Sequence, residues 1–138
     1  MPFNGYLWQW LLQHTRADEL DALLEDAYRL LPLAELASGP EDNLGLGPDY
    51  AADSALQVII QGLQRFPGAG WPLVAAALNN PVTRSRNGAL RVLDAWPTDD
   101  WPDAAREALV QARDAEPSAD VRQRIQALLD DGKLTDGL

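Results

Sequence analysis

Apolar residues recur at every third or fourth position through most of this sequence, which is the spacing of amphipathic helices rather than the alternation of strands. The first apolar stripe predicts a helix that Asn4 caps and that runs to about His14. This stripe consists of Phe3, Tyr6, Leu7, Trp10 and Leu11. A second, leucine-rich stripe predicts a helix that Thr15 caps and Pro32 interrupts, followed by one or two turns over residues 33–37.

The rest of the chain predicts five more helices, and no alternating run of β-branched residues indicates a strand. The third helix covers about 49–66, the fourth 71–78 and the fifth about 84–96. The sixth is expected to follow a cap at residues 98–100 and to bury Trp101, Ala104, Ala105, Ala108, Leu109 and Ala112. Ser118 is expected to cap the seventh and Gly132 to end it. The predicted fold class is therefore all-α.

Two segments of the second half are variants of one helical pattern. Residues 81–94 and 117–130 both begin with proline and superpose after a shift of about 36 residues. The shift aligns Arg86 with Arg122, Leu93 with Leu129 and Asp94 with Asp130. Each copy follows a Trp-Pro dipeptide, Trp71-Pro72 or Trp101-Pro102, at an expected helix start. The pattern indicates a helical repeat.

The second copy resembles the second helix of a HEAT-type repeat. The resemblance is carried by Asp120-Val121-Arg122 and by the apolar residues Ile125, Leu128 and Leu129, with Asn80 to Leu93 as a looser copy. Ser85 and Gly88 stand where a regular copy has apolar residues. The similarity covers roughly residues 70–131 and implies a HEAT/armadillo-like fold: a small right-handed α-solenoid of stacked antiparallel pairs, about seven helices in all, whose usual role is to hold a partner.

Length and composition favour one soluble domain. The chain has 138 residues, a formal net charge of −10 and a pI near 4.3, so residues 1–138 are expected to form a single helical repeat domain with a frayed tail at 133–138. The negative charge disfavours direct binding to nucleic acid or anionic lipid. No cysteine is present, and neither a signal peptide nor a membrane span is recognisable, so a cytoplasmic location is expected.

The acidic residues are concentrated in the first half. Ten acidic residues and a single basic residue, Arg29, lie between Ala17 and Gln64. Asp18, Asp21, Glu25 and Asp26 fall opposite the leucine stripe of the second predicted helix. Such a face is either solvated surface or a docking face for a basic protein.

The longest segment without periodicity is the loop of residues 38–49, which contains three glycines and two prolines. Glu41 and Asp42 continue the acidic face into this loop, whereas Leu44 and Leu46 alternate with glycine and could contact a partner. The alternative is that the loop only connects two helical pairs.

Tryptophans are expected in two roles. Trp71, Trp96 and Trp101 lie on or beside buried stripes and are expected to pack between repeats. Trp8 lies off the main stripe of a terminal helix, where it either caps the fold or contacts a partner.

Catalytic chemistry is disfavoured by the residue types present. His14 is the only histidine, and at the end of a helix it is expected to interact with the last carbonyls. Carboxylate pairs four residues apart, Asp49 with Asp53 and Asp99 with Asp103, fall at expected helix starts, where acids are common. No phosphate, dinucleotide or calcium motif is present. We therefore expect no enzymatic activity, no cofactor and no metal.

Two function classes follow from these observations. A small, acidic, cysteine-free helical chain resembles bacterial immunity proteins in general style, which implies a non-catalytic inhibitor that neutralises a basic toxin or effector. Its candidate partner-binding residues are Trp8, Asp18, Asp21, Glu25, Asp26, Glu41, Asp42, Leu44 and Leu46. The alternative is a HEAT-like scaffold or adaptor that joins cellular proteins, with polar contacts from the loop and from the only concentrated positive charge, Arg84, Arg86 and Arg91.

Overall fold

The protein folds into helices joined by short connections. The structure, a computed structural model, describes the backbone of residues 5–41 and 50–134 and the side chains of residues 9–41 and 50–134. These ranges contain eight α-helices and no β-strand, which confirms the all-α prediction. The helices are α1 (Gly5–His14), α2 (Leu20–Leu30), α3 (Leu33–Leu36), α4 (Ala51–Gly62), α5 (Trp71–Leu78), α6 (Thr83–Ala95), α7 (Ala105–Ala115) and α8 (Ala119–Asp131), with 3-10 turns η2 (Leu63–Arg65) and η3 (Thr98–Asp100).

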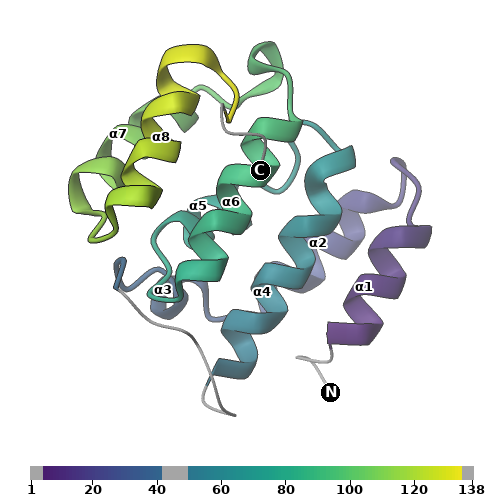
Figure 1. The fold of residues 1–138 in the computed structure, drawn as a ribbon. Helices are drawn as coiled ribbons and strands as arrows, with labels where there is room; N and C mark the ends of the chain where they lie inside the picture. The colour runs from purple at the N-terminus through teal and green to yellow at the C-terminus, as the bar shows by residue number, and fades with distance from the viewer. Residues whose placement is uncertain (1–4, 42–49, 135–138) are drawn as a thin grey trace.

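The longer helices are arranged in two layers. In the first layer α4 packs between α1 and α6, and α6 also packs against α8. Figure 1 shows these four helices side by side across the front of the view. Behind them, α5 contacts both α3 and α7. The layers meet where α5 packs on α6 and α7 packs on α8.

One connected cluster of buried side chains lies between the layers and draws on the whole series of helices. Apolar residues at helical spacing supply it, as the sequence predicts. Its large, almost fully buried members include Leu12, Leu56, Ile60, Leu63, Leu93, Trp96 and Leu109.

Two tryptophans join the ends of the helices to the core. The indole N–H of Trp96 donates to the carbonyl of Leu63 at 2.8 Å. The indole N–H of Trp101 donates to the carbonyls of Leu93 and Trp96, at 3.0 and 3.2 Å. The expected core position is thus confirmed for both, and Trp71 is half-buried against the same cluster. Each buried indole therefore satisfies its one donor on a backbone carbonyl.

Small residues allow the neighbours of α4 to approach closely. At Gly62 an added Cβ would lie 2.7 Å from the Cβ of Leu12 on α1. At Gly88 on α6 an added Cβ would lie 3.3 Å from Cδ1 of Ile60 on α4, and Ser85 is fully buried on the same helix. Ser85 and Gly88 stand where a regular HEAT copy has larger apolar residues, and their small size allows the close packing of α6.

The predicted cap of the second helix is wrong. The Thr15 hydroxyl donates to the carbonyl of Leu11, at the end of α1, and does not cap α2. Residues 17–19 form a turn, and α2 begins at Leu20. A threonine hydroxyl can bond the carbonyl four residues back as readily as it caps the next helix, and here it closes the preceding one.

The predicted start of the sixth helix is also wrong. Trp101 has an extended backbone (ψ 137°), and α7 begins only at Ala105. Pro102 disfavours a helical conformation of the residue before it, and the extended backbone accompanies the inward position of the Trp101 indole. Ala104, expected to be buried, is exposed. By contrast, Trp71-Pro72 does begin α5.

The two ends of α8 are formed as the sequence predicts. Ser118 caps α8 by accepting from the N–H of Val121, and Gly132 ends α8 with a φ of +70°. Leu134 packs against the core and donates its N–H to the Asp94 carboxylate at 2.8 Å. Residues 135–138, the greater part of the tail predicted to be frayed, lie outside the described residues, so the frayed tail stays a prediction.

Candidate partner-binding surface

The carboxylates of the α1–α2 turn and of α2 form a surface that we call the α2 acidic surface. It comprises Asp18, Glu19, Asp21, Glu25 and Asp26. All are exposed except Asp26, which is half-buried. The helical spacing places Leu20, Leu24 and Ala27 in the core on the other side of α2, so the predicted separation of acidic and apolar faces is present.

Two arginines neutralise part of this surface. Arg16 pairs with Glu19 at 3.0 Å and lies 3.6 Å from Asp18, while Arg29 pairs with Asp26. These pairs are largely exposed, so they are worth little in stability. Asp21 and Glu25 have no ion pair within the described part of the chain. They are the two carboxylates of α2 whose charge is least compensated.

Asp21 also influences a neighbouring phenol. Burial raises the pKa of Tyr28 above its ordinary value of 10.0, and the negative charge of Asp21 raises it further. Both causes disfavour the phenolate. The charge of Asp21 on the acidic surface thus acts on the half-buried Tyr28 of the same helix.

The other predicted partner-binding residues are only partly placed. Glu41 is exposed. Asp42, Leu44 and Leu46 lie outside the described residues, so their predicted role stays a prediction. The backbone of Trp8 belongs to α1, and its side chain is not among those described.

Trp10, predicted to face the core, is instead 56% exposed. Its ring stacks on that of His14, with centroids 4.5 Å apart, and His14 Nδ1 donates to the Trp10 carbonyl at 2.8 Å. The expected role of His14 at the end of the helix is confirmed. The predicted stripe placed the buried side of α1 on the wrong face of the helix. Leu12, outside that stripe, is buried against Gly62.

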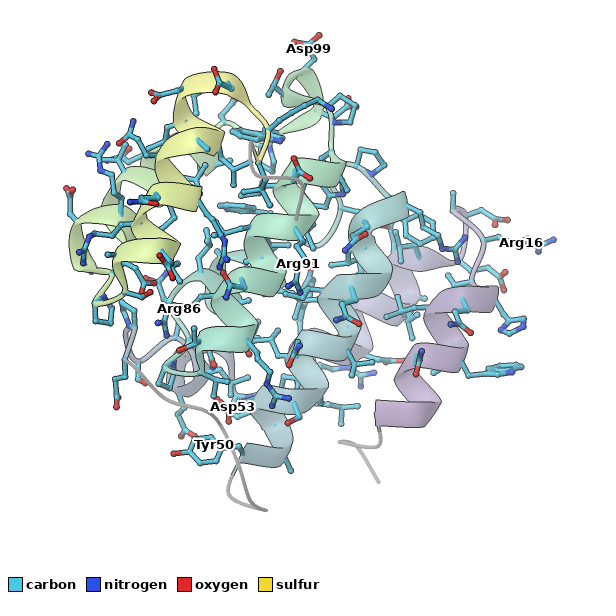
Figure 2. All side chains as sticks on the ribbon, viewed as in Figure 1. Arg16, Tyr50, Asp53, Arg86, Arg91 and Asp99 are labelled. Atoms are coloured by element: carbon cyan, nitrogen blue, oxygen red, sulfur yellow. The ribbon has the colours of Figure 1, made fainter. Side chains whose placement is uncertain are left out.

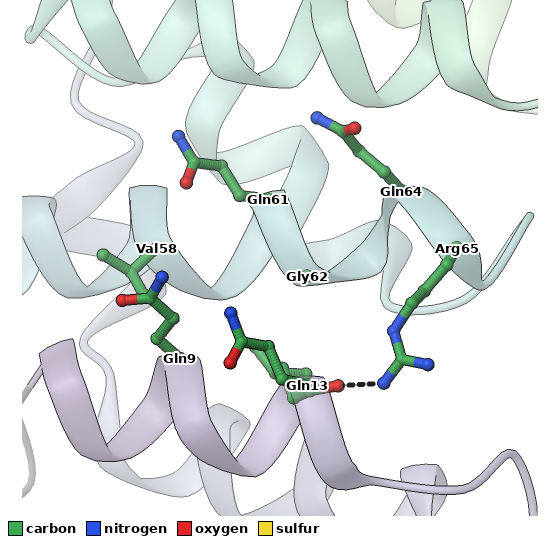
Figure 3. A pocket seen from close by; sticks show the side chains of 8 residues that line it. Gln9, Gln13, Val58, Gln61, Gly62, Gln64 and Arg65 are labelled. Carbon is green, nitrogen blue, oxygen red and sulfur yellow. Dashed lines mark hydrogen bonds between the residues drawn. The ribbon is translucent and has the colours of Figure 1, made fainter.

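A groove lies between α1 and α4, with a volume of about 320 Å³ (Figure 3). Its apolar floor includes Leu12, Val58 and Gly62. Gln9 and Gln13 reach from α1 toward α4, whereas the side chains of Gln61 and Gln64 point away from α1 (Figure 3). The groove therefore combines an apolar floor with carboxamides and has no carboxylate in its lining.

Arg65 closes one end of this groove. Its Nη2 donates to the carbonyl of Leu12 and, at 3.3 Å, to that of Thr15. The guanidinium also lies over the Phe66 ring, 4.6 Å from its centroid. Arg65 thus binds the C-terminal turn of α1 to η2 across more than fifty residues of sequence. The sequence does not predict this groove, because the i,i+4 spacing of Gln9 and Gln13 does not reveal which helix packs beside α1.

One of the three arginines assigned to a scaffold surface is buried. Arg86 is 1% exposed and forms a bidentate pair with Glu116, Nε to Oε1 at 2.6 Å and Nη2 to Oε2 at 2.8 Å. Its Nη1 donates to the carbonyls of Asn80 and Pro81 at 3.1 and 2.9 Å. The prediction that Arg86 offers contacts to a partner is wrong, because these internal acceptors occupy its donors. Arg91, on the same helix, is exposed (Figure 2).

Of the two predicted carboxylate pairs, Asp53, Asp99 and Asp103 are among the described residues, whereas Asp49 lies outside them. No group of three or more potential ligands comes together among the described residues. Asp53 accepts instead from the Asn80 carboxamide at 2.8 Å, and Asp99 and Asp103 are exposed. No helix in these ranges is both long and apolar enough to cross a membrane.

Comparisons with protein-family models, with curated proteins and with solved structures find no match to the chain. The proposals below therefore rest on the residues and geometry of this protein.

Proposed function

We propose that this protein is a non-catalytic binding module that captures a basic protein on its α2 acidic surface. The observation that supports the proposal is the pair Asp21 and Glu25, two exposed carboxylates on one side of α2 without a compensating cation in the described residues. Complementary charge speeds the encounter of two proteins and disfavours wrong partners. The formal net charge of −10 adds a long-range attraction for a cationic partner.

The form of this function that fits best is an immunity-type inhibitor. A toxin or nuclease with a cationic cleft binds phosphates there, and carboxylates presented on a rigid helix can occupy the same positions. Trp10, stacked on His14 at the end of α1, offers exposed aromatic area seven residues before the turn of residues 17–19 that contains Asp18. Exposed tryptophans of this kind are common at the energetic centre of interfaces.

Affinity purification from the native host, washed in parallel at low and high salt, tests the proposal. We expect one stoichiometric basic partner that the low-salt wash retains and the high-salt wash weakens, since screening acts most strongly on exposed charges. The Asp21→Lys/Glu25→Lys variant should keep its fold, because both side chains are exposed, and should lose most of this partner.

The matched control is Asp99→Lys/Asp103→Lys, which makes the same change in net charge at two exposed carboxylates. Asp99 lies in η3 (Figure 2), and Asp103 follows it. This variant should retain the partner. Equal retention by both variants, or equal loss, would show that the α2 acidic surface has no specific role.

The second candidate function is a scaffold or adaptor. It is favoured by the row α1, α4, α6 and α8, which offers one extended face, and by the packing of α5 on α6 and of α7 on α8. We propose that these pairs are the stacked units of a small right-handed α-solenoid of the HEAT type. Several partners retained at high salt, in place of one basic partner, would favour this second function.

A further inference from the structure

Arginines on the outer side of α6 and α8 carry positive charge that the fold does not compensate. Arg84 and Arg91 are exposed and form no hydrogen bond or ion pair within the described residues. Arg124 of α8 is half-buried and donates its Nη1 to Oδ1 of Asn87 at 3.0 Å, so its partner is a neutral carboxamide. None of these three guanidinium groups forms an ion pair with a described carboxylate.

Helical spacing gathers the three charges on one surface. Arg84, Asn87 and Arg91 are three and four residues apart, so they follow one side of α6. Arg84 and Arg91 are separated by two turns, or about 10 Å along the helix axis. The bond to Asn87 places the Arg124 guanidinium between their levels, across the contact of α6 with α8 (Figure 1). We call Arg84, Arg91 and Arg124 the α6–α8 basic surface.

Arg84 occupies a position where a cation opposes the fold. The first turns of α2, α4, α7 and α8 each contain a carboxylate, whereas the first turn of α6 contains none and includes Arg84. A cation at the N-terminus of a helix is repelled by the positive end of the helix dipole. The stability of α6 therefore does not account for Arg84. An anion beside it would be attracted by both the guanidinium and the dipole.

We propose that the α6–α8 basic surface binds a short acidic segment of a partner protein. Charge complementarity identifies this occupant, because three cations without counterions face solvent on an otherwise acidic chain. Arginine forms paired N–H···O bonds with carboxylates, and carboxylates spread over about 10 Å reach from Arg84 to Arg91. The Nε of Arg124 has no hydrogen-bond partner, so this guanidinium also has a donor in reserve.

A long polyanion such as nucleic acid fits this surface less well. Asp94 follows Arg91 by one turn of α6, and the exposed Asp120 precedes Arg124 by one turn of α8, so carboxylates flank the surface. The formal net charge of −10 adds a long-range repulsion that grows with the charge of the ligand. The surface therefore matches a few carboxylates rather than a continuous row of phosphates.

The test is a titration with the peptide acetyl-Glu-Glu-Glu-Glu-Glu-Glu-amide, followed by the arginine Nε–H resonances in NMR spectra. We expect saturable shifts of Arg84, Arg91 and Arg124, with a Kd that rises with salt because exposed charges are screened. The uncharged peptide of six glutamines, which has the same length, should give no shifts.

The variant Arg84→Gln/Arg91→Gln should raise the Kd about tenfold, since two exposed ion pairs of modest strength are lost. It should not lower the Tm, because both side chains are exposed and Arg84→Gln removes a cation from the first turn of α6. The matched control is Arg16→Gln/Arg29→Gln, which makes the same change in net charge at exposed arginines already paired with carboxylates. This control should bind the peptide like the parent protein.

Equal weakening by both variants would show that net charge alone attracts the peptide. Shifts centred on other residues, shifts that do not saturate, or equally tight binding of hexathymidylate would also overturn the proposal. Sedimentation of the protein alone tests another occupant: self-association that Arg84→Gln/Arg91→Gln abolishes would assign the surface to a second copy of the chain. None of these results depends on the basic partner of the α2 acidic surface, so the two proposals fail separately.

Discussion

Arg86 shows that a charged side chain can be buried when internal acceptors engage its donors. Four of its N–H groups are engaged, two by Glu116 and two by the carbonyls of Asn80 and Pro81. Glu116 in turn accepts from the N–H of Ser118, and its own carbonyl accepts from Arg122. The pair thereby fixes the start of α6 to the connection between α7 and α8.

Removing both members of this pair should cost less stability than the two single removals added together. Arg86→Met leaves a buried carboxylate with a single remaining donor, and we expect it to reduce the free energy of unfolding by about 3–5 kcal/mol. Arg86→Met/Glu116→Gln removes both charges and should lose less than the sum of the two single variants. Urea unfolding followed by circular dichroism measures the four species, and strict additivity would show that the pair is energetically uncoupled.

Tyr28 makes the folded state sensitive to alkaline pH. Its folded-state pKa is raised above 10.0, chiefly by burial and then by Asp21, so the folded state holds the phenolic proton more tightly than the unfolded chain does. The resulting stability is fully present below pH 10 and is lost as the pH rises through the folded pKa. Spectrophotometric titration of tyrosinate should show a late-ionising component that Tyr28→Phe removes and that Asp21→Asn moves to lower pH. An unchanged titration curve in both variants would contradict this assignment.

At the scale of the element, α4 is positioned by glycines at both of its contacts in the front layer. Leu12 meets Gly62 through its Cβ, which cannot rotate away, whereas Ile60 meets Gly88 through Cδ1, the end of a flexible side chain. Both contacts pair a glycine with an aliphatic residue. Ile60 can move its Cδ1 away from an added methyl group, whereas Leu12 cannot move its Cβ without shifting α1.

The two alanine substitutions should therefore differ in effect. Gly62→Ala forces α1 away from α4 and should cost about 1–3 kcal/mol of stability. Gly88→Ala should be close to neutral, because alanine favours a helix interior by about 1 kcal/mol over glycine and Ile60 can adjust. Urea unfolding compares the two variants, and Leu12→Ala in the Gly62→Ala background should recover part of the loss. A larger loss for Gly88→Ala than for Gly62→Ala would refute this account of the packing.

At the scale of the whole molecule, the sequence predicts where the helices lie better than it predicts what their side chains contact. Periodicity locates α4 and α8 because each has an apolar stripe and a clear stop, such as Gly132. Trp71-Pro72 marks the start of α5 instead, since this helix is buried on most sides. The errors at Thr15, Trp101 and Arg86 have a common origin: each side chain binds backbone or a carboxylate that local spacing does not identify. Spacing alone also could not show that Leu12 is buried and Trp10 exposed.

The sequence predicts the exposed acidic residues of the candidate site but not the groove beside α1. The charge pattern of α2 is local, so Asp18, Asp21 and Glu25 are exposed as the sequence indicates. The groove required the pairing of α1 with α4, two segments separated by α2 and α3. Its glutamines are unremarkable until that pairing is known.

The pairing of α1 with α4 also bears on the order of folding. Arg65 joins η2 to the carbonyl of Leu12 over a sequence separation of 53 residues, whereas α5 with α6 and α7 with α8 are neighbours in the chain. Closing the longer loop costs entropy that is recovered only once α4 is in place. We therefore expect local pairs to form early and α1 to dock last. In that order Gly62→Ala accelerates unfolding and leaves the folding rate unchanged, so this end of the molecule would open first and limit its kinetic stability.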